Sequence, residues 1–258
     1  MSDAVTLTLR RPLDAALDLD GLTPQRCLPL DGQEIAALPV WMGGRPVRLG
    51  DLFAVRGERS DRLRIEGDLH LAAHVGAGMT GGELIVDGNV GDDAGAAIGG
   101  GVLWIQGSAG ARLGAARPGA ARGMTGGEIV VHGAAGPDAG ARARRGLIAI
   151  GGDTGRDAAR AMIAGTLVVL GHTGDAPGRG NKRGSIIAAG GIEVPATYRY
   201  ACTYQPPHTR LTLVYLRRRY GLAIDDRLTD GRYQRYCGDA GDPGKGEILV
   251  LDRPGAGG

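Results

Sequence analysis

Two histidines, His70 and His74, have a spacing that could hold a metal ion. Residues four apart share one face of a helix, where two imidazoles can bind the same ion. These two, however, follow Gly67 in a glycine-rich stretch where we expect no helix, and no third ligand is near in the sequence. Because zinc sites use three or four ligands, we predict no metal site.

The motifs of nucleophilic and phosphate chemistry are missing from the sequence. It has no Gly-x-Ser-x-Gly elbow, and Gly244-Lys245-Gly246 lacks the full spacing of a P-loop. We therefore predict no catalytic residue. Cys27, Cys202 and Cys237 lie far apart and form no Cys-x-x-Cys pair. This pattern favours reduced thiols in a cytoplasmic protein.

One charged segment could bind a ligand. Between Pro195 and Tyr220 there are five arginines and no acidic residue, and Arg217, Arg218 and Arg219 are consecutive. Guanidinium groups favour carboxylates and phosphates, so these three are our candidate residues for contact with an anionic cofactor. A solvated basic face and an interface between subunits are the alternatives.

Overall composition excludes several classes of protein. The 30 basic and 28 acidic residues nearly cancel, which argues against a general nucleic-acid binder. No apolar run is long enough to span a membrane, and the N-terminus lacks the features of a signal peptide, so we expect no membrane contact. Glycine is unusually frequent, with 48 of 258 residues, against about 7% in ordinary proteins.

The glycines divide the chain into three parts: an N-terminal segment (1–61), a glycine-rich block (62–191) and a C-terminal segment rich in tyrosine and arginine (192–258). In the first part, the alternation over 5–9 predicts a strand, 33–38 predicts a short helix, and 52–55 predicts another strand.

The middle block is a repeat in which a short aliphatic strand ends at a glycine. These marker glycines are Gly67, Gly88, Gly107, Gly133, Gly152, Gly171 and Gly190, with spacings of 21, 19, 26, 19, 19 and 19. Nineteen residues are too few for a βαβ unit but enough for one coil of a solenoid. We therefore predict an all-β fold: a right-handed parallel β-helix of about seven coils with period 19, plus N- and C-terminal flanking segments. A second set of glycines before the strands predicts turns with positive φ or close backbone approach.

Stacking these units aligns two columns of aliphatic residues that should line the core. The first is Leu63, Leu84, Leu103, Ile129, Ile148, Leu167 and Ile186, and the second is Ile65, Val86, Ile105, Val131, Ile150, Val169 and Ala188. Six of the seven residues between them also are apolar: Ile85, Trp104, Val130, Ala149, Val168 and Ile187. Strands that are apolar on both faces usually are covered on both. The cover would be either a terminal segment of this chain, which we favour, or a partner subunit.

One interval is seven residues longer than its neighbours. The extra residues, near 115–123, include Arg117 and Arg122. Insertions of this kind often lie on a binding face, although a tolerated surface loop is the simpler interpretation.

Three stretches together resemble a known family. They are 34–41 (EIAALPVW) with 47–53 (VRLGDLF), the repeat block with Gly123-Met124-Thr125-Gly126-Gly127, and 236–239 (YCGD) with 244–250 (GKGEILV). The chain resembles the C subunit of formylmethanofuran dehydrogenase and of its bacterial relative, the formyltransferase/hydrolase complex. Its glycine-bracketed repeats also resemble the GXGXG β-helix of the glutamate synthase large subunit.

The family resemblance implies a cytoplasmic complex that transfers formyl groups between tetrahydromethanopterin and methanofuran, or an analogue, and releases formate. It implies an amidohydrolase-like subunit with metals and a formyltransferase subunit as partners, and a carrier with a glutamate-rich tail. This chain would be a non-catalytic scaffold that binds no cofactor of its own, apart from the tail contact proposed for Arg217, Arg218 and Arg219. A free-standing β-helix enzyme and a glutamate-synthase-like coupling domain are the alternatives.

Overall fold

The structure, a computed structural model, describes residues 4–240 and 242–253. The N-terminal part forms short elements: β1 (Val5–Leu9), β2 (Leu17–Asp18), α1 (Pro24–Cys27), α2 (Gly32–Ala36), β3 (Pro39–Met42), β4 (Arg45–Arg48), α3 (Leu49–Leu52) and β5 (Phe53–Arg56). The strand predicted over 5–9 is confirmed. The predicted helix begins earlier, at Gly32, because the side chain of Asp31 accepts hydrogen bonds from the first-turn amides of Gln33 and Glu34.

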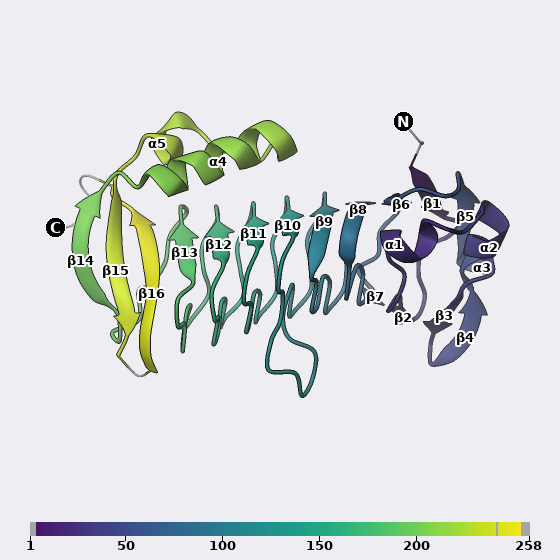
Figure 1. The fold of residues 1–258 in the computed structure, drawn as a ribbon, viewed down its shortest axis with the longest axis horizontal. Helices are drawn as coiled ribbons and strands as arrows, with labels where there is room; N and C mark the ends of the chain where they lie inside the picture. Colours follow the sequence, from purple (N-terminus) through teal and green to yellow (C-terminus); the bar gives the residue numbers. More distant parts are fainter. Residues whose placement is uncertain (1–3, 241, 254–258) are drawn as a thin grey trace.

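The repeats and the C-terminal part supply the longer elements (Figure 1). They are β6 (Arg62–Glu66), β7 (Ala72–Ala73), β8 (Thr80–Asp87), β9 (Gly100–Ile105), β10 (Glu128–Val131), β11 (Leu147–Ile150), β12 (Thr166–Val169), β13 (Ser185–Ala188), β14 (Arg199–Tyr204), α4 (Pro207–Tyr220), α5 (Asp226–Thr229), β15 (Tyr233–Asp239) and β16 (Asp242–Leu251).

Successive repeat strands pair in parallel with the register that the glycine spacing predicts. Ile129 lies opposite Ile148, which lies opposite Leu167, and the same order holds for Val131, Ile150 and Val169. The longer interval does not disturb this register, since β10 still pairs with β9 through Ile129 and Leu103. Both predicted columns are therefore confirmed.

The predicted fold class, an all-β right-handed parallel β-helix of about seven coils, is wrong. The chain forms a mixed sheet of 12 strands, in the order β14-β15-β16-β13-β12-β11-β10-β9-β8-β6-β1-β5, and a separate sheet, β4-β3-β2-β7. Helices are also present. The expected GXGXG β-helix is wrong for the same reason.

The physical cause of this error lies in the flanks. Periodicity predicts only the seven repeat strands, whereas β1, β5, β14, β15 and β16 have no repeat and still join the same sheet. The pairs β1–β5, β14–β15 and β15–β16 are antiparallel. The two ends of the repeat block are paired in parallel, β6 by β1 and β13 by β16, so the flanking strands occupy the edges that the repeats would otherwise leave free. Away from the sheet, the repeat connections align through isolated bridges such as Val90–Ala109 and Ala135–Thr154.

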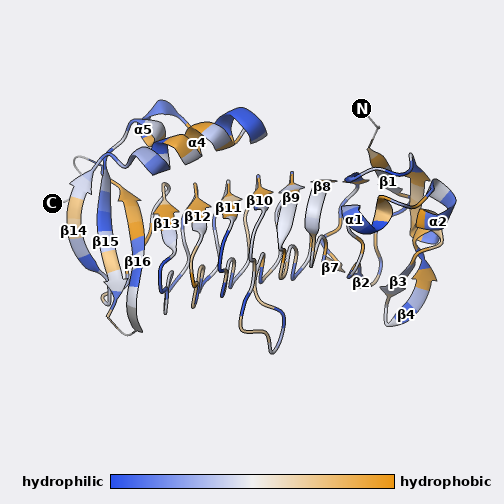
Figure 2. Ribbon diagram, in the orientation of Figure 1, coloured by the Kyte–Doolittle hydropathy of each residue, from blue (hydrophilic) through white to orange (hydrophobic). Residues whose placement is uncertain are grey.

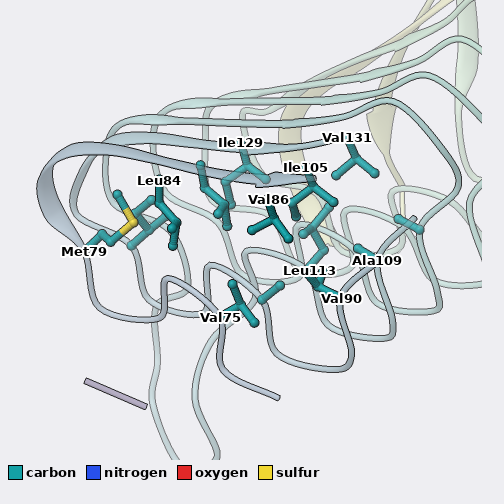
Figure 3. Close-up of a cluster of buried hydrophobic side chains, with 14 of the residues drawn as sticks. Val75, Met79, Leu84, Val86, Val90, Ile105, Ala109, Leu113, Ile129 and Val131 are labelled. Atoms are coloured by element: carbon teal, nitrogen blue, oxygen red, sulfur yellow. The ribbon is translucent and has the colours of Figure 1, made fainter. Parts of the chain in front are cut away.

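The main core lies between the sheet and these connections. Figure 3 shows Leu84, Val86, Ile105, Ile129 and Val131 pointing from the strands towards Val75, Met79, Val90 and Leu113. Ile150 is fully buried between Val131 and Val169, as the stacked columns predict.

A second core covers the outer face of the sheet. Val130, Ala149, Val168 and Ile187 are fully buried and cluster with Leu213, Leu216 and Tyr220 of α4. In Figure 2 the ends of β10 to β13 beneath α4 are coloured as hydrophobic. The predicted cover is thus confirmed for these four positions, and it is the chain's own C-terminal segment. Trp104 and Ile85, nearer the N-terminal end, stay partly exposed. The three-part division of the chain stays a prediction.

The glycines before the strands have the conformation that their recurrence predicts. Five of the six, Gly82, Gly101, Gly127, Gly146 and Gly165, have positive φ, whereas Gly184 does not. At Gly127, with φ of 81°, a Cβ atom would also lie 2.6 Å from the carbonyl oxygen of Gly101 in the neighbouring repeat. Close approach and left-handed geometry therefore both require glycine at this position.

Candidate functional site

Helix α4 contains the basic segment that the sequence singles out. Pro207 occupies its first turn, where a missing amide proton has no consequence, and Gly221 ends it with φ of 69°. Its buried residues are Thr209, Leu213, Leu216 and Tyr220. Their spacing of four, three and four places them on one face, towards the sheet. The opposite face is open to solvent, and Leu211 on it is 71% exposed.

The three candidate arginines lie in the last turn of α4, where positive charge complements the helix dipole. Consecutive helical residues point in different directions, so the structure separates them. The Nη1 of Arg217 donates to Asp226 Oδ1 of α5 at 2.8 Å. Arg219 lies on the other side, with Nε 3.1 Å from the hydroxyl of Tyr220 and Nη2 3.4 Å from Glu83 Oε1. Arg218 is exposed and has no carboxylate partner among the described residues.

Arg217 and Arg218 line a cavity of about 490 Å³ between α4 and α5. Its other lining residues are Pro207, Arg210, Leu211, Val214, Asp226, Thr229 and Asp230. Arg210 and Asp230 form an ion pair at 3.3 Å. Three arginines against two aspartates leave one net positive charge, which is enough for contact with one carboxylate or phosphate group at a time.

A tyrosine–glutamate network fixes the end of α4, and sequence reasoning missed it. The hydroxyls of Tyr215 and Tyr220 donate to Glu128 Oε2 of β10 at 2.8 and 2.6 Å. Two effects raise the pKa of Tyr220: burial, which is the larger, and the hydrogen bond to the Glu128 carboxylate. The ring of Tyr220 also meets Trp104 edge-on, with centroids 5.4 Å apart. The available signal was the gathering of every tyrosine after residue 197, which does not reveal a partner 92 residues away.

His70 and His74 lie on either side of β7, and each has its own partner. His70 Nδ1 is 2.9 Å from Asp68 Oδ2, whereas His74 Nδ1 is 2.9 Å from Asp18 Oδ1 of β2. Across residues 4–240 and 242–253, no group of three or more His, Cys, Asp or Glu side chains could hold a metal ion. The structure therefore does not assemble a metal site around this pair.

The insertion near 115–123 covers a smaller cavity of about 170 Å³ whose lining includes Arg112, Arg117, Arg142, Arg160 and Asp138. Most of these arginines already contact acids. Arg117 forms two hydrogen bonds to Asp20, at 2.8 and 2.6 Å, and Arg160 donates to Asp138 at 2.7 Å. Arg112 likewise contacts Asp92 and Asp93. The arginines around this cavity are therefore balanced by nearby aspartates. The insertion thus connects the N-terminal part to the repeats, and α4 remains the stronger candidate site.

No protein-family model matches the chain. Over 86 residues it is 36% identical to the C subunit of the formyltransferase/hydrolase complex Fhc from Methylorubrum extorquens, covering 33% of this chain and 32% of that relative. Over 91 residues it is 31% identical to the C subunit of the tungsten-containing formylmethanofuran dehydrogenase 2 from Methanothermobacter thermautotrophicus, covering 33% and 34%.

The fold is similar to a chain in the crystal structure of the formyltransferase/hydrolase complex FhcABCD from Methylorubrum extorquens, in complex with methylofuran. The TM-score is 0.79 and the identity 34%, over 96% of this chain and 100% of that chain. The chain belongs to the family of the C subunits of formylmethanofuran dehydrogenase and Fhc. The resemblance noted in the sequence is thereby confirmed.

The sequence alignments with these C-subunit relatives span about a third of the relatives' length, whereas the structural alignment spans its whole neighbour. The similarity to these relatives is therefore more extensive in fold than in sequence. Within the described part of this C-subunit homologue, no helix is both long and apolar enough to cross a membrane.

Proposed function

We propose that this chain is a non-catalytic scaffold subunit of a formyltransferase/hydrolase-type complex. The complex would transfer formyl groups between tetrahydromethanopterin and methanofuran, or an analogue, and release formate. The observation that carries the proposal is the likeness over 96% of the chain to a component of FhcABCD, whose crystal structure contains methylofuran. A relative that is 36% identical is a named subunit of the same kind of complex.

The partners that follow from this proposal are an amidohydrolase-like subunit, which would hold the metals, and a formyltransferase subunit. The location would be the cytoplasm, in accord with three free cysteines, of which Cys202 is exposed. The carrier would be a methanofuran-type molecule bound mainly by the partner subunits.

We also propose that the α4 surface guides the anionic tail of the carrier, with Arg217, Arg218 and Arg219 as the contact residues. Arg218 is the centre of this surface because the other two already interact within the chain. One exposed arginine–carboxylate contact contributes about 0.2–1 kcal/mol, so the effect of each residue is small and depends on salt.

Purification of the tagged chain from the organism that encodes it tests the scaffold proposal. We expect both partner subunits, identified by mass spectrometry, and formyl-transfer activity only when they are present. Recovery with a glutaminase would instead favour a glutamate-synthase-like coupling domain. Recovery of the chain alone, with catalytic activity, would favour a free-standing enzyme.

Arg218→Gln in the assembled complex tests the tail contact. We expect KM for the carrier to rise by up to about fivefold at low salt, with assembly intact, and the difference to shrink as salt increases. Arg227→Gln is the matched control, because Arg227 is an exposed arginine outside the α4–α5 cavity. Equal KM values for the two variants would refute the tail contact, and loss of assembly in Arg218→Gln would show an interface between subunits instead.

A further inference from the structure

Three neighbouring repeats place basic residues at one edge of the large sheet. The edge consists of the turns that lead into β11, β12 and β13, over 139–147, 158–166 and 176–185. The turns lie side by side, since the Ile163 amide donates to Ala143 O at 2.7 Å and the Lys182 amide to Met162 O at 2.8 Å. They contain no acidic residue and seven basic ones, which we call the basic edge: Arg142, Arg144, Arg145, Arg160, Arg179, Lys182 and Arg183.

Most of these cations have no acidic partner in the part of the chain that the structure describes. Arg160 and Arg179 are paired with Asp138 and Asp157, at 2.7 and 2.8 Å. Arg142 donates to a backbone carbonyl. Within residues 4–240 and 242–253, four side chains form neither an ion pair nor a hydrogen bond: Arg144, which is half-buried, and Arg145, Lys182 and Arg183, which are exposed.

The acidic residues on the adjoining strands are already engaged. Glu128, which begins β10, accepts hydrogen bonds from two tyrosines of α4. Glu247 of β16 accepts from Arg235 at 2.7 Å, and Asp239 of β15 accepts from the Gly180 amide at 2.7 Å. The chain therefore leaves the charge of the basic edge without a carboxylate to pair with.

The turn that presents Lys182 and Arg183 is fixed by a buried asparagine. Asn181 is fully buried, its Nδ2 donates to Gly184 O at 2.9 Å, and its Oδ1 accepts from the Gly184 amide at 2.8 Å. The two basic residues lie between these clamped positions. On β16 the row continues with Lys245, whose amide donates to the Lys182 carbonyl, while Asp242 stands three residues earlier in the sequence. Cations on a fixed backbone lose little freedom when they bind.

The charge of the basic edge restricts what can bind there. A second copy of this chain does not fit, because a two-fold contact would set the same cations against each other. Nucleic acid is disfavoured, since the three turns contain no aromatic residue on which bases could stack, and basic and acidic residues of the chain nearly cancel. A protein surface with carboxylates fits, because guanidinium and ammonium groups pair with carboxylates and steer association.

We propose that the basic edge docks an acidic surface of a different subunit of the complex. The contact residues are Arg144 and Arg145 in one turn and Lys182 and Arg183 in another. Two repeats separate these pairs, so the matching surface carries carboxylates at two places about 10 Å apart. This inference rests on the proposed membership of a complex, and it gives the basic edge a role separate from that of α4.

The test replaces Lys182 and Arg183 together by glutamate in the tagged, assembled complex. We expect the apparent affinity for the partner subunits to fall at least about tenfold at low salt, and the difference to shrink as salt increases. The melting temperature of the isolated chain should not change, because both side chains are exposed. The matched control is Arg11→Glu with Arg56→Glu, which changes the net charge equally at exposed arginines of the N-terminal part.

Carbodiimide cross-linking gives an independent readout that needs no charge reversal. The reagent joins an amine to a nearby carboxylate with loss of water, and Lys182 and Lys245 are the only lysines of the chain. In the wild-type complex, mass spectrometry should find Lys182 joined to an aspartate or glutamate of another subunit. In Lys182→Arg the link should vanish while association stays at the wild-type level, because the positive charge is kept.

The outcomes separate the docking edge from the proposed function. If wild type recovers no partner subunits, the proposed function itself fails. If the reversal and the control retain the partners equally, or if Lys182 links only to acids of its own chain in the assembled complex, only the docking edge is refuted. A raised KM for the carrier with association intact would show contact with the carrier instead and would overturn it. Nucleic acid that co-purifies with wild type but not with the reversal would overturn it as well.

Discussion

The clearest test of the repeat architecture is a pair of glycine substitutions that share one backbone conformation. Gly127 and Gly119 have φ of 81° and 77°, so alanine incurs the same left-handed cost of about 1–2 kcal/mol at either position. The two differ in their surroundings. A Cβ at Gly127 would lie 2.6 Å from Gly101 O and 2.9 Å from the carbonyl carbon of Gly100, whereas at Gly119, in the insertion, nothing lies within 4 Å.

Gly127→Ala must therefore push neighbouring repeats apart, which adds about 1–3 kcal/mol, as overpacking does. We expect the free energy of unfolding to fall by about 1–2 kcal/mol in Gly119→Ala and by about 2–5 kcal/mol in Gly127→Ala. Urea denaturation followed by circular dichroism measures both. Equal losses in the two variants would refute the close approach of the repeats, because only that contact distinguishes the positions.

Three further predictions concern the core, the cover and a buried thiol. Ile150→Ala should lower the free energy of unfolding by about 2–5 kcal/mol, and Leu211→Ala by less than about 0.5 kcal/mol; similar values would mean that the register is wrong. Leu216→Asp should lift α4 from the sheet and increase binding of a hydrophobic dye, while Leu211→Asp should not. Burial raises the pKa of the Cys27 thiol to about 11 from an ordinary 9.0. Its contribution to stability is therefore complete below pH 9 and is lost as pH rises to 11. The free energy of unfolding, measured between pH 9 and pH 11, should fall by up to about 1.4 kcal/mol per pH unit in wild type and less steeply in Cys27→Ala. Equal slopes in the two proteins would refute the raised pKa.

The sequence predicted the repeat strands and their register because one rule, burial of alternate aliphatic residues, acts again in every unit. Leu84, Leu103 and Ile129 illustrate this, since they align although an insertion lies between the last two. The fold class was wrong because β14 to β16 and β1 obey no repeat. Their place in the sheet depends on which backbone edges remain free once the repeats have stacked, and this is a property of the assembled chain.

The candidate site was predicted only in outline. A run of three arginines on a helix indicates positive charge, but not the directions in which the side chains point. Arg217 and Arg219 pair with residues nine and 136 positions away, and those partners decide which arginine stays open.

Helix α4 explains how a stack of short repeats can be held rigid, as the proposed scaffold role would require. Each repeat strand contacts only its neighbours, so a linear stack can open locally at any interval. The buried face of α4 packs in one cluster with residues from β10, β11, β12 and β13, and Arg219 reaches Glu83 of β8. Opening any one of these intervals must therefore also disturb α4 or bend the cluster beneath it. A helix that couples many repeats keeps its own exposed face at a fixed position along the sheet, and the proposed guidance of a carrier by that face would require this.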